Sequence, residues 1–429
     1  MLNINSSIQN CINFSYNDYN ENISLLSNGK GVFIFNYLNY DKEPCIFKIL
    51  NNEKNDGYIV EFTQKNIIVK ELESNLYLED KNNNKGLISL NGAYYWFSID
   101  SKNQCLYAGI GEPRIETIVY EYNYNYIKTT PNLLETNKNF MESLTTITII
   151  NSNIIPLKLF REPISNYISL YVKDIDELTM DDIANNNYLP SLYLSPISQL
   201  LYNSISGKKF VLDDSDFPDF TKAIEHSITT PGLWCYEKLI QQSSEFNKDK
   251  YNIHETYLRI KIGNNNDNYS DIHYEMNIWP IGHYSPIYCD SYSDAIIRVL
   301  HGNINILLYP FFNNNRQSIS PFTSANFTKD NITWVSPTLN KIHQFKNLDT
   351  NKDICITIKS YICSFDNFTN YNKDIIQQYE NDTIDFTSFK ELMKIEWENK
   401  KQNFLEIIFS KKFWINSFNL LNDILLPNI

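Results

Sequence analysis

Two long blocks of short alternating segments constrain the fold more than any other feature of this sequence. Each segment is rich in β-branched and aromatic residues, and turn-forming clusters separate one segment from the next. The first block runs from residue 28 to about 128, and the second from residue 256 to about 365. Representative segments are 31-GVFIFNYL-38, 57-GYIVEFT-63, 272-IHYEMNIWPI-281 and 304-INILLYPF-311. Blocks of this kind predict a mainly β protein with two separate β-domains.

The segments between and after the two blocks have helical spacing instead. Apolar residues fall on one stripe in 196-PISQLLYNSISG-207, 219-DFTKAIEHSI-228 and 234-WCYEKLIQQSSEF-246, and again in residues 386–409. Because the three helices before the second block are short and have a single apolar stripe, they cannot form a bundle by themselves. We expect them to pack on the second β-block.

Pro131, Pro156 and Pro163 mark the place where the first alternating pattern weakens, and they indicate a domain junction. The order that follows, helices, a strand-rich barrel and helices again, describes a cupin. The predicted fold is an N-terminal β-sandwich followed by a cupin β-barrel flanked by helices. The predicted organisation is a sandwich over 1–130, a linker with connecting strands over 131–175, a cupin domain with N-terminal helices over 176–370 and a C-terminal helical extension over 371–429.

Composition and charge limit the classes of partner. The chain carries a net charge of −13, and 42% of its residues are hydrophobic and 14% aromatic, which excludes a disordered polymer. No cluster of Lys and Arg is present to neutralise a phosphate backbone, so no nucleic-acid partner is expected. The seven cysteines are widely spaced and form no CxxC pair, which indicates neither a disulfide framework nor a zinc ribbon.

The first twenty residues, MLNINSSIQNCINFSYNDYN, lack a basic segment followed by an apolar run, and no window approaches 18 apolar residues. The sequence therefore predicts an intracellular, cytoplasmic protein with no membrane partner. The abundance of Asn, Ile, Lys and Tyr is typical of an AT-rich genome. In a large DNA virus of that composition, a virion component would be a natural role.

The segment 96-WFSIDSKNQCLYAGIGE-112 resembles the end of the farnesoic-acid-methyltransferase-like β-sandwich domain, in which a Trp-containing strand leads into a glycine-punctuated one. The resemblance covers about a hundred residues, 28–128. Gly109 and Gly111 fit a bulge or a turn better than a phosphate cradle. The resemblance implies either a structural sandwich or a recognition module, and the second interpretation predicts a protein partner through the N-terminal sandwich.

Residues 196–366 resemble the cysteine dioxygenase family, thiol dioxygenases in which a cupin barrel holds a non-haem iron through three histidines. Family members carry a stretch of the form W-x-x-G-H-x-S-x-I-H-x-H, then a leucine and a glycine turn, and a further histidine about fifty residues later. The residues in register here are Trp279, Gly282, His283, Ser285, Ile287, Leu300, Gly302 and His343. The resemblance spans about two fifths of the chain and implies a cupin fold.

The chain departs from that family at the metal. Tyr288 and Asp290 stand at the positions of two iron ligands, and His343 is the only ligand retained. The second-shell cysteine of the family, which in some members is crosslinked to a tyrosine, falls on Ala295. The resemblance therefore implies a degenerate iron site.

Two other positions match the family. Arg259 matches the arginine that binds the substrate carboxylate, which implies a substrate-binding role and a small carboxylate or thiol ligand. Tyr361 matches the tyrosine beside the iron, which implies a catalytic role. Lys359 replaces the histidine that usually lies two residues before this tyrosine.

Strand alternation places residues 288 and 290 on one face, so Tyr288, Asp290 and His343 can converge inside the barrel. One imidazole, one phenol and one carboxylate make a poorer Fe(II) site than a histidine-rich set. The phenol, with a reference pKa of about 10, would have to lose its proton. Two interpretations stay open: hydrogen-bonded fillers of a site with no cofactor, or an altered site that holds iron. His343 is correspondingly a hydrogen-bonded barrel histidine or a metal ligand.

A buried guanidinium at Arg259 needs an anion, and the sequence offers two: a bound carboxylate ligand, or Asp290 across the cavity. The preferred hypothesis is a non-catalytic binding or structural cupin. The alternative is an active non-haem iron thiol dioxygenase that oxidises a small thiol or amino acid through substitute ligands. We prefer the first because losing two of three ligands should cost more than the roughly 10- to 100-fold that second-shell changes cost.

Overall fold

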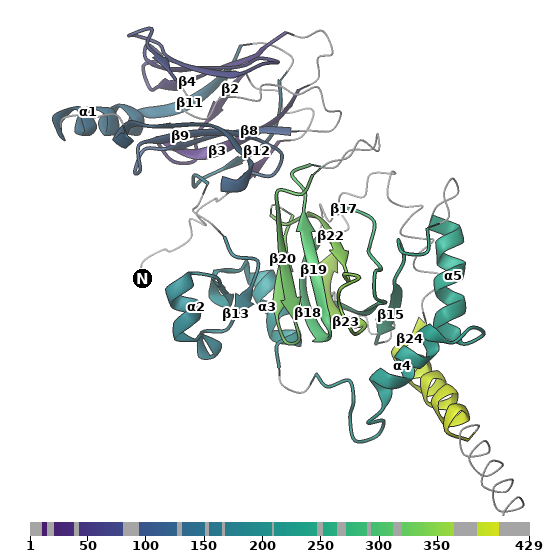
Figure 1. Ribbon diagram of the computed structural model, residues 1–429. Coiled ribbons are helices and arrows are strands. Elements are labelled where there is room, and N and C mark those ends of the chain that lie inside the picture. Colours follow the sequence, from purple (N-terminus) through teal and green to yellow (C-terminus); the bar gives the residue numbers. More distant parts are fainter. Residues whose placement is uncertain are drawn as a thin grey trace, which may run out of the picture.

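The structure consists of two β-rich units, one above the other (Figure 1). It is a computed structural model. It describes residues 11–14, 21–37, 43–79, 94–126, 131–150, 154–164, 168–207, 210–246, 252–263, 272–289, 293–311, 320–337, 339–363 and 384–402. Among these residues, no helix has both the length and the hydrophobicity needed to cross a membrane.

The first unit is a β-sandwich of two six-stranded antiparallel sheets. One sheet has the order β1 (Cys11–Asn13), β12 (Ile154–Phe160), β3 (Lys30–Tyr37), β8 (Tyr94–Asp100), β9 (Cys105–Ile110) and β10 (Ile118–Asn123). The other has the order β2 (Asn22–Ser24), β11 (Leu144–Ile149), β4 (Cys45–Asn51), β5 (Gly57–Phe62), β6 (Ile67–Glu71) and β7 (Tyr77–Leu78). Alternate residues of each strand point inward, and an aromatic core that includes Phe33, Phe35, Phe47, Phe62 and Phe97 fills the space between the sheets.

The sandwich reaches Phe160, beyond the boundary at residue 130 that the sequence predicts. β11 and β12, which the sequence pattern assigns to connecting strands, lie inside the two sheets. Pro156 does not end β12, because it stands at a register shift between β12 and β3, where a strand tolerates a proline. Pro131 occupies the first position of helix α1 (Pro131–Glu142), where its missing N–H is not needed.

The two glycines of the resemblance segment have packing roles. A Cβ on Gly109 would lie 2.2 Å from Cζ2 of Trp96, whose indole covers this point of β9. Gly111 has a φ of +84°, and a Cβ there would lie 2.0 Å from the carbonyl oxygen of Pro310 in the second unit. Gly111 is therefore a point of close approach between the two units.

The second unit is a cupin-type barrel made of an eight-stranded and a four-stranded sheet. The larger has the order β14 (Leu189–Pro190), β13 (Val172–Lys173), β21 (Ile332–Val335), β18 (Ser293–His301), β23 (Cys355–Cys363), β16 (His273–Trp279), β15 (Leu258–Ile262) and β24 (Ile384–Asp385). The smaller has the order β17 (Tyr288–Cys289), β22 (Ile342–Lys346), β19 (Asn303–Leu308) and β20 (Thr323–Thr328). The inner faces share a core that includes Ile297, Val299, Ile306 and Phe327. A mainly β fold, with a sandwich followed by a cupin barrel and helices around it, is therefore confirmed.

Helices cover the outer face of the larger sheet (Figure 1). They are α3 (Pro196–Ile205), α4 (Phe220–Thr229), α5 (Trp234–Phe246) and a helix over residues 386–402. Phe389 of the last helix packs with Leu258 of β15 and Phe220 of α4 in one buried cluster. Because β24 also pairs with β15, the described part of the predicted C-terminal extension belongs to the barrel domain.

The remaining elements are short. The helix α2 (Met180–Asn185) and the 3-10 turns η3 (Ile175–Glu177) and η4 (Ser191–Tyr193) precede α3, whereas η1 (Ile115–Thr117) and η2 (Tyr124–Tyr126) belong to the sandwich. The four apolar residues of α3 that the sequence assigns to one stripe divide between two faces. Leu201 and Ile205 are buried against the sheet, whereas Ile197 and Leu200 are exposed.

Candidate functional site

Strand alternation brings a group of polar side chains into the barrel. Leu258 and Ile260 of β15 pack on the helices outside, so Arg259 between them faces the interior. Met276 and Ile278 of β16 also face the helices, which turns Glu275 and Asn277 inward. Trp279, next on that inner face, lies in the barrel core.

The register of the sheet aligns these residues in rows that cross β15, β16 and β23. Arg259, Asn277 and Thr357 form one row. Lys261, Glu275 and Lys359 form the next row, and His273 pairs with Tyr361 in the row after that. Thr357 is buried and accepts a hydrogen bond of 3.2 Å from Nε1 of Trp279, whereas Lys359 and Tyr361 are partly exposed. The polar rows thus run from the buried core towards solvent.

Arg259 and Glu275 form the central ion pair of this group. Nη2 of Arg259 donates to Oε2 of Glu275 at 2.7 Å. Burial by itself raises the pKa of the Glu275 carboxyl, but the charges of Arg259 and then Lys359 outweigh it and hold that pKa below its ordinary value. Glu275 is therefore a carboxylate at neutral pH, and it is a third partner for Arg259 that the sequence did not predict. Asp290, the intramolecular partner that the sequence offered, lies outside the described residues.

Asn277 adds an acceptor beside this pair. A side-chain hydrogen bond joins Asn277 to Glu275. Since a carboxylate only accepts, the Asn277 amide nitrogen donates this bond. Its amide oxygen Oδ1 is buried and has no hydrogen-bond partner among the described residues, and the whole residue is only 6% exposed. A buried acceptor left in this state costs about 1–3 kcal/mol unless a ligand or water satisfies it.

Tyr361 lies at the outer end of the group. Its ring stacks on His273 with the centroids 5.3 Å apart, and Nζ of Lys359 is 5.2 Å from the same ring centroid. Ala295 pairs directly with Tyr361 across the ladder between β18 and β23. The structure therefore brings together the two positions that the family resemblance links, Ala295 and Tyr361.

His343 lies on β22 in the smaller sheet and is almost fully buried. Its Nδ1 is 3.0 Å from the backbone oxygen of Asn340. Because a carbonyl oxygen can only accept, Nδ1 carries the proton, and in the neutral ring Nε2 holds the lone pair. Tyr288 is the backbone neighbour of His343 across the ladder, although its side chain, like Asp290, lies outside what the structure describes.

The sandwich holds the turn that precedes His343. Asn340 has a φ of +60° and is buried. Its backbone N–H donates to Oε1 of Glu112 at 2.8 Å, its Oδ1 accepts from Nη1 of Arg114, and its Nδ2 donates to the oxygen of Trp334 at 3.0 Å. The side chains of Glu112 and Arg114, in the loop after β9, thus hold Asn340, whose carbonyl sets the proton position on His343.

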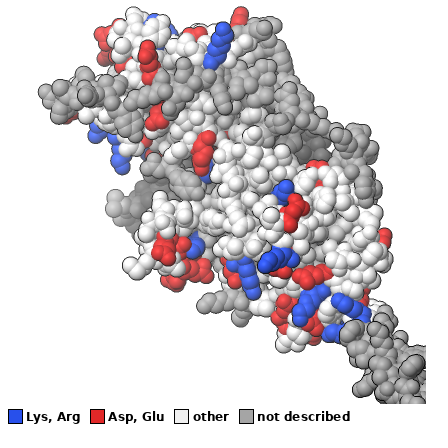
Figure 2. Space-filling view, viewed as in Figure 1, with Lys and Arg blue, Asp and Glu red and all other residues white. Residues whose placement is uncertain are grey.

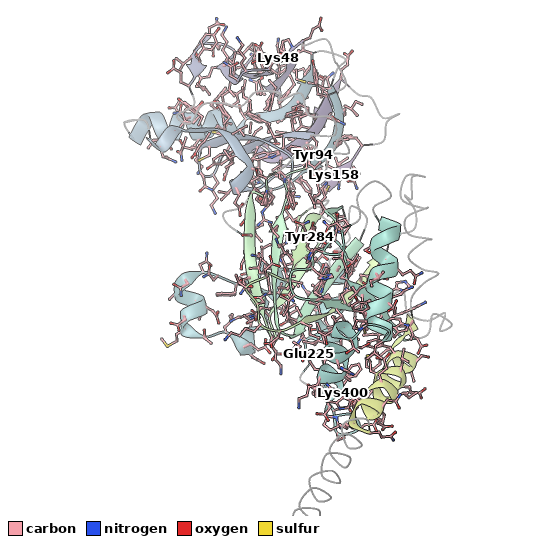
Figure 3. All side chains as sticks on the ribbon, turned by 45° about the vertical axis from the view of Figure 1, so that its right-hand side comes forward. Lys48, Tyr94, Lys158, Glu225, Tyr284 and Lys400 are labelled. Atoms are coloured by element: carbon pink, nitrogen blue, oxygen red, sulfur yellow. The ribbon has the colours of Figure 1, made fainter. Side chains whose placement is uncertain are left out.

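Glu112 and Arg114 are both buried where the two units meet, 3.4 Å apart. Nη2 of Arg114 also donates to the oxygen of Ile168 at 2.9 Å. Burial raises the pKa of Glu112, and the nearby charge of Arg114 offsets only part of this effect. Tyr94 of β8 lies on the side of the sandwich that faces the barrel (Figure 3), where Nζ of Lys341 is 4.4 Å from its ring centroid.

Sequence reasoning missed Glu275, Asn277, Glu112 and Arg114. The first two had a signal in 272-IHYEMNIW-279, where polar residues alternate with apolar ones although the strand belongs to the centre of a barrel. Polar residues on the inner face of a buried strand indicate a lumen site. Glu112 and Arg114 had no local signal, because their partner Asn340 is more than two hundred residues away.

The donors at the predicted metal positions do not match a three-histidine iron centre. His343 supplies one imidazole, and positions 288 and 290 carry a phenol and a carboxylate. Within the described residues, no group of three or more His, Cys, Asp or Glu side chains could hold a metal ion.

Comparison with known proteins gives matches in structure only. No protein-family model and no curated protein sequence matches the chain. The similar solved structures include the cupin domain of Cnp3 from Schizosaccharomyces pombe, with 12% identity and a TM-score of 0.20 over 25% of this chain and 61% of that one. A cupin 2 domain-containing protein from Halorhodospira halophila has 11% identity and a TM-score of 0.22 over 30% and 79%.

An RmlC-like cupin with a double-stranded β-helix fold from Methanocaldococcus jannaschii has 18% identity and a TM-score of 0.18 over 28% of this chain and 86% of that one. The chain covers less than two thirds of the Schizosaccharomyces pombe cupin domain and more than two thirds of the other two structures. These three structures are cupins, but TM-scores near 0.2 are too low for the likeness to support a conclusion about this chain. The finer resemblance to cysteine dioxygenases stays a prediction.

Proposed function

We propose that this chain is a non-catalytic cupin that binds a small carboxylate-bearing ligand inside its barrel. The observation that carries the proposal is the Arg259–Glu275–Lys359 group. Two cations, Arg259 and Lys359, lie around the Glu275 carboxylate. The buried Oδ1 of Asn277 lies next to the group and can accept a hydrogen bond from a ligand.

Arg259 has the chemistry that binds a carboxylate, because a guanidinium can donate two parallel N–H bonds to one carboxylate. Its Nη2 donates to Glu275 at 2.7 Å. The Arg259 side chain is 25% exposed, so solvent reaches part of it. Lys359 lies on the same side and adds a second positive charge for a ligand carboxylate.

Energetics also favour binding over a purely structural role. Replacing a buried ion pair by apolar side chains of similar volume is often neutral or stabilises a protein by about 1–4 kcal/mol. A barrel selected for stability alone would therefore gain little from Arg259, Glu275 and Asn277. A ligand that needs fixed charges and an amide oxygen accounts for all three.

The test is calorimetric titration with propionate, 3-mercaptopropionate, L-cysteine and cysteamine. We expect the three carboxylates to bind and cysteamine, which has no carboxylate, not to bind. Arg259→Met should weaken the carboxylates about tenfold or more, because a charge-assisted hydrogen bond contributes about 1.5–3 kcal/mol. The matched control is Lys346→Met on β22, which removes a cation 5.6 Å from the centroid of the Tyr284 ring. Equal affinity in the wild type and Arg259→Met would refute the proposal.

One observation favours a second candidate, an iron thiol dioxygenase with substitute ligands. Metal-binding histidines usually donate their other ring N–H to a carbonyl or carboxylate, as Nδ1 of His343 does to Asn340. Metal analysis of protein from iron-supplemented cells decides between the candidates. We expect substoichiometric iron, and oxygen uptake with cysteine or cysteamine equal to the buffer blank. Iron near one per chain would favour the second candidate.

A gain-of-function variant tests the predicted metal positions directly. If Tyr288 and Asp290 replace two family ligands, the double change Tyr288→His/Asp290→His should create iron binding together with His343. His343→Asn in that background is the control and should remove the metal again. Absence of iron in the double variant would contradict the assignment of residues 288 and 290 to the site.

A further inference from the structure

The segment between residues 175 and 200, apart from the ion-pair group, exposes many large apolar side chains. Among the described residues, fourteen large apolar side chains are exposed, and seven of them lie between residues 175 and 200. We call this set the 175–200 surface. Its members are Ile175, Met180, Ile183, Leu192, Tyr193, Ile197 and Leu200. Concentrated exposure of this kind marks interaction sites in folded proteins.

Within the described part of the chain, the outer side of helix α3 has no cover. Leu201, Tyr202 and Ile205 pack against β18 and β23, while Ile197 and Leu200 on another face are 46% and 54% exposed. A helix that is apolar on more than one face is normally buried on each of them. The outer face of α3 therefore has the composition of a covered surface.

Ordered elements carry the exposed side chains. In α2, Met180 and Ile183 are 88% and 60% exposed and, being three residues apart, lie on the same face of the helix. A capping box between Thr179 and Asp182 fixes the start of this short helix. Nε2 of Gln199 on α3 donates to the backbone oxygen of Leu192 at 3.0 Å, which ties η4 to α3.

Most of the charged side chains around the surface are acidic, and we call these acids the acidic rim. The acidic side chains are Asp174, Asp176, Glu177, Asp181 and Asp182, and no Lys or Arg occurs from residue 174 to residue 207. Lys173 pairs with Asp182 at 2.6 Å, and the structure gives the other four acids no cationic partner within its described residues. Figure 2 shows Asp and Glu side chains on this projecting segment, next to a Lys or Arg side chain.

We propose that the 175–200 surface docks a basic amphipathic segment of a partner protein. The apolar face of such a segment would cover Met180, Ile183 and Leu200, and its Lys and Arg side chains would reach the acidic rim. A second copy of this chain fits less well. In a twofold contact the same patch faces itself, which would bring two acidic rims together on chains that already carry a net charge of −13.

The test uses two fluorescent helical peptides of about 15 residues with the same leucine face, one with lysine and one with glutamate at the polar positions. Fluorescence anisotropy with the full chain should show binding of the Leu/Lys peptide and at least about tenfold weaker binding of the Leu/Glu peptide. Ile183→Ser/Leu200→Ser should weaken the Leu/Lys peptide about tenfold or more. Asp176→Asn/Asp181→Asn should weaken it and reduce its dependence on salt.

The matched control is Ile395→Ser, which removes an exposed isoleucine from the helix over residues 386–402 and should leave binding unchanged. Two results would overturn the proposal. One is equal binding of the Leu/Lys peptide by the wild type and Ile183→Ser/Leu200→Ser. The other is a wild-type dimer in analytical ultracentrifugation that the same double variant dissociates, which would assign the surface to a second copy. Circular dichroism shows that each variant is folded before it is used.

Discussion

The interiors of the two units differ in chemistry although both lie between β-sheets. The sandwich core is dominated by aromatic rings, with Phe47 in edge-to-face contact with Phe33 and Phe35 at centroid distances of 5.5 and 5.6 Å. The barrel core has an aromatic part as well, but it continues into the Arg259–Glu275 pair. Rings contribute to stability through area and contact, whereas a buried ion pair is a weak source of stability.

The difference fits a folding role for the sandwich core and the proposed binding role for the barrel interior. The sandwich interior is built mainly of apolar side chains, and their burial favours folding. The barrel interior contains polar groups that cost free energy to bury. Among the described residues they include the Arg259–Glu275 pair and the Asn277 amide oxygen, which has no hydrogen-bond partner there. This contrast supports the proposal that the barrel binds the ligand, and the sandwich supports the Asn340 turn through Glu112 and Arg114.

The largest expected effect is in the sandwich core. Phe47→Ala should lower the free energy of unfolding by about 3–5 kcal/mol, because it leaves a cavity among four other phenylalanines. Urea denaturation followed by circular dichroism measures the loss. Tyr77→Ala on β7, an exposed aromatic of the same unit, is the control and should change stability by no more than about 0.5 kcal/mol. Similar losses in both variants would remove the contrast between core and surface.

Breaking the ion pair should come next. Arg259→Met leaves Glu275 buried without its main counter-charge, and we expect a loss of about 3 kcal/mol, the low end of the range, because the guanidinium is partly exposed. Adding Glu275→Leu to the same chain should recover most of that loss. If the double variant were less stable than Arg259→Met alone, the pair would be a structural element and the comparison between the interiors would fail.

An acid-sensitive step should come from His283. Burial, which outweighs the backbone hydrogen bond to Thr256, lowers the pKa of His283 to about 4. Because the unfolded chain takes up this proton near its reference pKa of about 6.5, stability is full above that pH and falls as the pH drops towards 4. Between pH 7 and pH 5 the loss should be about 2 kcal/mol. His283→Asn should flatten this pH dependence, and an unchanged slope would assign the loss to other groups.

The smallest effect should come from Glu112, which joins the two units. Glu112→Gln keeps an acceptor for the Asn340 N–H, so the cost at pH 5 should be about 1 kcal/mol. Burial raises the pKa of Glu112, so the stability it contributes is full below its reference pKa and is lost as pH rises through the folded value. The gap between wild type and variant should therefore shrink from pH 5 to pH 8. A widening gap would show that Glu112 is held as a carboxylate.

The sequence predicted the fold class because strand alternation is a local property. Residues 31–38 and 272–281 show the period of two that a sheet imposes, and helical spacing indicated the covering helices. The weakened pattern around Pro131, Pro156 and Pro163 indicated a junction, but β11 and β12 pair within the sandwich sheets, and a register shift accommodates Pro156. The family motif singled out Arg259, His343 and Tyr361. That these three residues form one site stays a prediction.

Only the tertiary structure decided the partners. Arg259 meets Glu275 on a neighbouring strand, and Asn340 meets Glu112 and Arg114 from the other unit. The sequence also could not show that α3 keeps Ile197 and Leu200 exposed. The physical reason is the same in each case. Side-chain periodicity follows from the backbone of a single strand or helix, but pairing and burial depend on which distant segments the fold brings together.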